Sequence, residues 1–109
     1  MSFTVEPSQL FIKKLKPLLK KYHSLEEDID DLVSELKDHP TLGTPLGKNA
    51  YKIRLGIGSK GNGKSGGGRV ITLVKFMDGK VVLSYIYDKS EVVNLTDSEL
   101  QAIINEMSE

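Results

Sequence analysis

The chain has 109 residues, no cysteine, and 15 basic residues balanced by 15 acidic ones. A chain of this length forms one domain, residues 1–109, with a single modest core; the lack of cysteine excludes disulfides, thiolate zinc sites and a cysteine nucleophile. The N-terminus carries no signal-like apolar run and no stretch approaches the roughly 18 apolar residues of a membrane span, so we expect a cytoplasmic protein without a membrane partner.

The N-terminal third predicts a short strand followed by two helices. Residues 2–5 alternate in hydropathy as an edge strand does. Apolar residues recur at helical spacing over residues 8–21, where Pro17 should bend or interrupt the helix. A second helix is expected to begin at a capping box at residues 24–27 and to end at residues 39–40 (His-Pro). Helices joined by so short a turn form a helical hairpin.

The remaining two thirds predict a loop, three strands and a final helix. Residues 41–49 have the proline and glycine content of an ordered loop. In the strand at residues 50–58, Lys52 and Arg54 point to an open face while alternate apolar residues point to the core. Two further strands follow at residues 69–77 and 80–88.

A two-residue hairpin turn, Asp78-Gly79, is expected between these last two strands. A second capping box, at residues 96–99, begins the C-terminal helix. The sequence therefore predicts an α+β fold in which a short strand and a helical hairpin pack on a small antiparallel sheet. The helices should cover one face of the sheet and leave the other open for function.

Charge is segregated along the chain although the total is zero. Residues 41–77 contain no acidic residue. The basic residues in this segment are Lys48, Lys52, Arg54, Lys60, Lys64, Arg69 and Lys75. A basic face of this kind indicates a phosphate-bearing partner.

Residues 58–65, GSKGNGKS, match the phosphate-loop pattern of nucleotide-binding proteins. That pattern binds phosphates only where a helix begins at its lysine. Three glycines follow at residues 66–68 and a strand follows them, so no helix can begin there. We expect no nucleoside triphosphate partner.

The basic segment contains a KIRL strand followed by GKSGGGRVI, residues 63–71, a Lys-Ser-Gly-Gly-x-Arg hairpin. In these motifs and in the order of its elements, the chain resembles the RelE/HigB-type toxins of the RelE/ParE toxin–antitoxin superfamily. The resemblance implies a RelE-like fold and a ribosome-dependent mRNA endonuclease. Such a toxin cleaves RNA through the 2′-hydroxyl without metal or other cofactor, and its partners are the ribosome, mRNA and a cognate antitoxin. Two alternatives stay open: a ParE-like, non-enzymatic gyrase inhibitor, and a catalytically weak RNA-binding relative.

On this resemblance Arg69 matches the motif arginine and is assigned to the scissile phosphate, where a planar guanidinium suits bidentate contact. The alternative is an arginine that begins a strand and pairs with a nearby acid. Lys89 lies where relatives carry a basic residue, and is a candidate proton donor or phosphate clamp. The full catalytic set is Arg69, Lys52, Arg54, Lys64, Lys89 and Tyr87. The RNA-binding set is Lys48, Lys60, Ser65, Gly66, Gly67, Lys75 and Tyr85.

The general base is where the chain departs from the family, since the tyrosine that some relatives carry near the C-terminus is missing. Tyr85 and Tyr87 share one strand face, so either could substitute for it, stack on a base or belong to the core. His23 and His39 are remote from the basic strands and are interpreted as structural. The acidic run at residues 26–31 lacks calcium-loop spacing and is interpreted as a solvated helix face, so no metal site is expected.

Overall fold

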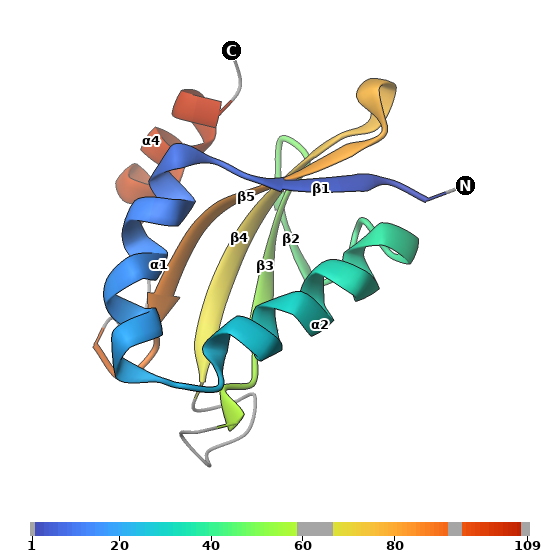
Figure 1. The fold of residues 1–109 in the computed structure, drawn as a ribbon. Coiled ribbons are helices and arrows are strands. Elements are labelled where there is room, and N and C mark those ends of the chain that lie inside the picture. The colour runs from blue at the N-terminus through green and yellow to red at the C-terminus, as the bar shows by residue number, and fades with distance from the viewer. Residues whose placement is uncertain (1, 59–66, 92–94, 108–109) are drawn as a thin grey trace.

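The computed structural model describes residues 2–58, 67–91 and 95–107. Its elements in chain order are β1 (Thr4–Pro7), α1 (Gln9–Lys21), α2 (Leu25–Asp38), β2 (Thr44–Gly47), β3 (Ala50–Leu55), β4 (Gly68–Lys75), the short 3-10 helix η2 (Phe76–Asp78), β5 (Lys80–Asp88) and α4 (Asp97–Met107). Figure 1 shows one twisted sheet with helices packed around it. The predicted α+β class is confirmed.

The sheet has five strands in the order β1-β5-β4-β3-β2, which is more than the sequence predicted. β2 lies inside the segment predicted as a loop, and its antiparallel pairing with β3 makes it an edge strand. An edge strand tolerates Pro45, because a proline needs no partner on the solvent side. The proline content that indicated a loop is therefore compatible with a strand at this position.

The three strands predicted to be antiparallel, β3, β4 and β5, are antiparallel. β1 pairs with β5 in parallel, so the sheet as a whole is mixed. The backbone N–H of Thr4 donates to the carbonyl of Gly79, and that of Ser8 to the carbonyl of Leu83, both at 2.9 Å. Long-range pairing of the first strand with the last leaves no signal in the local sequence.

The first helix is a single element with Pro17 inside it, so of the two predicted effects of this proline, a bend or an interruption, the interruption does not occur. The N-cap Ser8 accepts a hydrogen bond from the backbone N–H of Phe11 at 3.1 Å. Phe11 and Leu18, on either side of the proline, are both buried against the sheet. We attribute the continuity of the helix to this packing, which outweighs the local preference of proline.

The second helix has its predicted bounds but not its predicted cap. Ser24 has helical backbone angles and makes no capping bond; its hydroxyl donates instead to Asp28 at 2.9 Å. The C-cap is His39, as expected. Figure 1 shows α1 and α2 diverging from a shared corner, so the predicted helical hairpin is splayed rather than packed side by side.

The capping box of the C-terminal helix is present. The N–H of Thr96 donates to the Glu99 carboxylate at 3.0 Å, and the N–H of Glu99 donates to the Thr96 hydroxyl at 3.1 Å. Hydrogen bonds from the backbone and the side chain of Thr96 to the Glu99 carboxylate hold the pKa of Glu99 below its usual range. The start of this helix is thus specified locally.

Two cores lie on opposite faces of the sheet. The larger lies under α1 and α2 and includes Leu25, Val70 and Val81. The smaller joins Ala50 and Leu73 of the sheet to Ile104 of α4. The C-terminal helix therefore lies on the face that was expected to stay open, because its apolar stripe needs a surface to cover.

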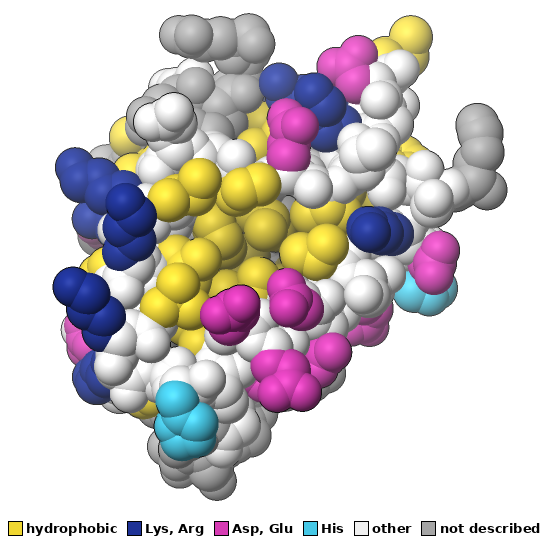
Figure 2. All heavy atoms as spheres, in the orientation of Figure 1, with side chains coloured by type: hydrophobic (Ala, Val, Ile, Leu, Met, Phe, Trp, Pro, Cys, Tyr) yellow, Lys and Arg dark blue, Asp and Glu magenta, His cyan; other side chains and the backbone are white. Residues whose placement is uncertain are grey.

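Figure 2 shows hydrophobic side chains gathered between α1 and α2, with basic residues on the α1 side and acidic residues on the α2 side. No helix within the described ranges has the length and hydropathy to cross a membrane.

The β4–β5 connection is longer than the predicted two-residue turn. Lys75 pairs with Lys80, so the loop holds four residues, three of them in η2. Gly79 follows with φ 61°, the left-handed conformation that its Asp-Gly signal indicated.

Gly43 and Gly47 form a matched pair for testing backbone strain. Both have positive φ, +104° and +89°, but a Cβ at Gly43 would lie 2.5 Å from the carbonyl oxygen of Lys52, whereas one at Gly47 meets nothing within 4 Å. We expect Gly47→Ala to lower the free energy of unfolding by about 1–2 kcal/mol through strain alone. Gly43→Ala should cost clearly more, because a steric clash is added. Urea unfolding measures both, and equal losses would contradict the close approach of Gly43 to Lys52.

Candidate functional site

Three strands place Arg54, Arg69 and Tyr87 in one row across the sheet. Arg54 of β3 is directly opposite Arg69 of β4, and Arg69 is directly opposite Tyr87 of β5. Directly opposed residues of antiparallel strands point to the same face. That face is the one opposite α1 and α2. The residues that alternate with Arg54, Arg69 and Tyr87 along the three strands point the other way and belong to the larger core, which lies under these helices. We call this set the arginine–tyrosine row.

A second row, one pair of residues further along the strands, contains Lys52, Ile71 and Tyr85. The Tyr85 and Tyr87 rings are tilted with centroids 6.3 Å apart. The Nζ atom of Lys14 lies 5.8 Å from the centre of the Tyr85 ring. Lys14 was absent from the sequence-based set, because its position on the polar side of α1 says nothing of which strand it will meet.

The two arginines of the row differ in exposure. Arg54 is exposed and forms no ion pair with any described residue. Arg69 is only 5% exposed, and its Nη1 donates to the carbonyl of Gly68 at 3.0 Å. A charge held in a dry environment acts on its neighbours more strongly than one in water.

The two tyrosines are both held in their neutral form. Burial raises the pKa of Tyr87 above its ordinary value of 10.0, and the charge of Arg69 offsets part of this increase. Burial also raises the pKa of Tyr85, and the carboxylate of Glu99 adds to the effect. Both phenols are therefore hydrogen-bond donors at neutral pH.

These raised pKa values predict a loss of stability at high pH. A group that binds its proton more tightly in the folded state stabilises that state fully below its unfolded pKa, and the contribution is lost as pH rises through the folded pKa. We expect the free energy of unfolding to fall from about pH 10 upward. Tyrosinate absorbance should show two tyrosines titrating above their ordinary value.

Replacing Arg69 by methionine should raise the pKa of Tyr87 further, because the positive charge that lowers it is removed. A Tyr87 pKa unchanged by Arg69→Met would contradict the proximity of the two side chains.

A further candidate, Lys89, lies just past the end of β5. Lys89 is half-buried, and its backbone N–H donates to the carbonyl of Gly67 at 3.1 Å. Gly67 immediately precedes β4 and itself is buried. Lys89 and Gly67 are thus neighbours at the end of the sheet that carries Arg69 and Tyr87.

A buried carboxylate fixes this end of β5 to the corner between α1 and α2. Asp88 is 2% exposed and accepts hydrogen bonds from the hydroxyl of Tyr22, from the N–H of Ser90 at 2.9 Å and from the Ser90 hydroxyl at 2.7 Å. Lys21 Nζ lies 3.7 Å from the same carboxylate. Asp88 was not among the residues singled out from the sequence; the one available signal was its place at the end of an otherwise apolar strand.

The other sequence-based candidates do not join this site within the described structure. Lys48, in the β2–β3 turn, and Lys75 lie at the opposite end of the sheet, because Asn49 is bonded to Val74 there. Lys75 lies six positions along β4 from Arg69, or about 20 Å. The remaining candidates, Lys60, Lys64, Ser65 and Gly66, lie outside the described residues.

His23 and His39 are exposed and lie at the two ends of α2, away from the row. Among the residues with described positions, no three His, Asp or Glu side chains are grouped to hold a metal ion.

The sequence matches no family model and no curated protein. The structure is similar to that of a free-state mutant of the E. coli toxin RelE in which two arginines are replaced by alanine. The TM-score is 0.65 at 14% sequence identity, and the match covers 98% of this chain and 99% of the other. The chain therefore has a RelE-like fold.

Proposed function

We propose that this chain, with the fold of the toxin RelE, is the toxin of a toxin–antitoxin module and cleaves mRNA on the ribosome. The observation that carries the proposal is the arginine–tyrosine row, with Lys52 and Lys89 beside it. Two guanidinium groups and neutral phenols are grouped on one sheet face, with Arg54 exposed and Arg69 and Tyr87 buried beside it. Such groups are suited to RNA phosphates and bases.

Cleavage through the 2′-hydroxyl creates negative charge on the scissile phosphate and on the leaving 5′-oxygen. We assign Arg69 and Arg54 to the phosphate. Their positions in a directly opposed strand pair suit contact with two non-bridging oxygens of one phosphate. The exposed Arg54 is expected to make the first contact, and the buried Arg69 to act where its field is least screened.

Tyr87 is better suited to donate a proton than to remove one. Its raised pKa keeps the phenol protonated at neutral pH, and a general base must be unprotonated in the reactive state. We therefore propose Tyr87 as a hydrogen-bond or proton donor, with Tyr85 as a stacking surface for a base. Lys52 and Lys89 are proposed to hold the RNA backbone on either side.

The test is to incubate purified protein with translating ribosomes and to map new RNA ends. New ends that require the ribosome support the proposal, and their absence from active, folded protein refutes it. A DNA supercoiling assay on the same sample tests the gyrase alternative. Binding of ribosomes without cleavage would favour the catalytically weak relative.

A further inference from the structure

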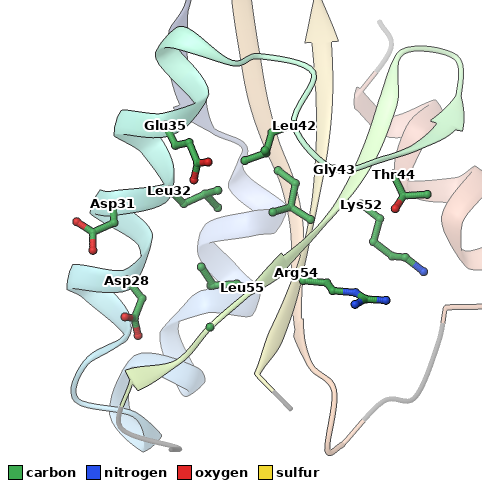
Figure 3. A pocket seen from close by; sticks show the side chains of 12 residues that line it. Asp28, Asp31, Leu32, Glu35, Leu42, Gly43, Thr44, Lys52, Arg54 and Leu55 are labelled. Atoms are coloured by element: carbon green, nitrogen blue, oxygen red, sulfur yellow. The ribbon is translucent and has the colours of Figure 1, made fainter. Parts of the chain in front are cut away.

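A groove lies between α2 and β3, and its lining includes Lys52 and Arg54 of β3. Its volume is about 440 Å³. Leu32, Leu42, Ile53 and Leu55 form its apolar lining, and Asp28, Asp31 and Glu35 of α2 add three carboxylates. Figure 3 shows the Lys52 and Arg54 side chains directed away from α2, toward the other face of the sheet.

β3 leaves one side of its backbone open at this groove. β2 pairs with β3 only as far as Lys52, while β4 pairs with it as far as Leu55. In the described part of the chain no strand continues alongside β3 beyond Lys52. The edge next to Arg54 and Gly56 is therefore a strand edge without a neighbour in the described structure.

The direction of the backbone groups follows from two contacts. The carbonyl of Asn49 accepts a hydrogen bond from Val74 of β4, so the odd-numbered residues of β3 direct their backbone groups toward β4. The carbonyl of Lys52 lies against Gly43, on the opposite side. By the same alternation, Arg54 directs both N–H and C=O to the open side of β3. Gly56, just past the end of the strand, also lines the groove.

The carboxylates of α2 indicate which kind of ligand could bind in the groove. Glu35 is exposed on the groove side of α2, and Asp31 lies at the outer rim. Neither forms an ion pair with a described residue. Asp28 already accepts the N–H of Gly58 at 3.1 Å, which anchors the end of the groove.

We propose that this groove binds an extended, basic segment of a partner protein as an added strand beside β3. Its backbone would pair with Arg54 and Gly56. One apolar side chain would enter the lining around Leu32 and Leu55, and a lysine or arginine would meet Glu35. The proposed binding edge lies on the other side of β3 from the Arg54 side chain. Binding there does not depend on whether the chain cleaves RNA.

The experiment adds each of three hexapeptides, acetylated at the N-terminus and amidated at the C-terminus, to the full-length protein and follows the backbone amides of the protein by NMR. The first probe is Lys-Val-Lys-Leu-Lys-Val, the second replaces each lysine by glutamate, and the third carries N-methyl groups on alternate residues of the first. In the free protein, the amides of Arg54 and Gly56 should exchange rapidly with solvent. The basic peptide should shift and protect these amides at up to about millimolar concentration, while the other two bind at least about fivefold more weakly.

A matched pair of variants tests the role of charge. Glu35→Lys should weaken the basic peptide about fivefold, whereas Asp30→Lys, an equal charge change on α2 outside the groove, should leave binding unchanged. Amides protected in the free protein would show that the edge is already covered and would overturn the proposal. So would equal binding of the acidic or the N-methylated peptide, no binding of the basic peptide, or shifts confined to the surface between α1 and α2.

Discussion

Replacing Arg69 by methionine should lower ribosome-dependent mRNA cleavage about 10²–10³-fold and relieve growth arrest in a bacterial host. The magnitude is that of removing one preorganised group that stabilises developing negative charge. The measurement is the rate at which new RNA ends form on translating ribosomes, with the protein shown to be folded by its unfolding midpoint. Methionine is preferable to alanine because Arg69 is 5% exposed, and truncating a buried side chain leaves a cavity that lowers stability.

Two control variants separate this role from packing and from total charge. Arg69→Lys keeps the charge but loses the planar fork, so it should retain an intermediate rate. Lys37→Met removes one charge from an exposed position of α2 next to Phe3, at the end of the sheet opposite the row, and should cleave at the normal rate. A folded Arg69→Met protein with full activity would exclude Arg69 from the mechanism.

Replacing Asp88 by alanine should lower the free energy of unfolding by about 2–4 kcal/mol. The carboxylate is buried, and its removal deletes the hydrogen bonds that it accepts from the hydroxyl of Tyr22 and from the N–H and hydroxyl of Ser90. Urea unfolding gives the free energy of unfolding. An unchanged m value, the slope of this free energy against urea concentration, would show that the unfolded states of the two proteins are comparable.

The neighbouring Glu91 provides the contrast for Asp88. Its carboxylate accepts a hydrogen bond from Lys21 at 2.9 Å, but the side chain is exposed. Glu91→Ala should therefore leave the unfolding midpoint nearly unchanged, because an exposed ion pair contributes little. If Asp88→Ala and Glu91→Ala had equal effects, the buried network would not be what fixes β5 to the helices.

Elements specified by short-range patterns were predictable from the sequence. The apolar stripe of α2, its end at His39 and the capping box at Thr96 depend on residues within a few positions of one another. The alternation that placed Lys52 and Arg54 on the face away from the larger core also needs only the local strand period. Local signals failed where packing decided, as at Pro17, or where a hydroxyl had two competing partners, as at Ser24.

The sequence by itself determined an α+β chain whose acid-free middle forms strands with basic residues on one side. Only the tertiary structure decided that Arg54, Arg69 and Tyr87 form one row, because strand register depends on contacts between distant segments. The low exposure of Arg69 and the raised pKa of Tyr87 are also decided by the tertiary structure, because neighbours from other strands bury these side chains. Tertiary packing also decided the position of α2, which brings Asp31 and Glu35 beside a basic strand that has no acidic residue of its own.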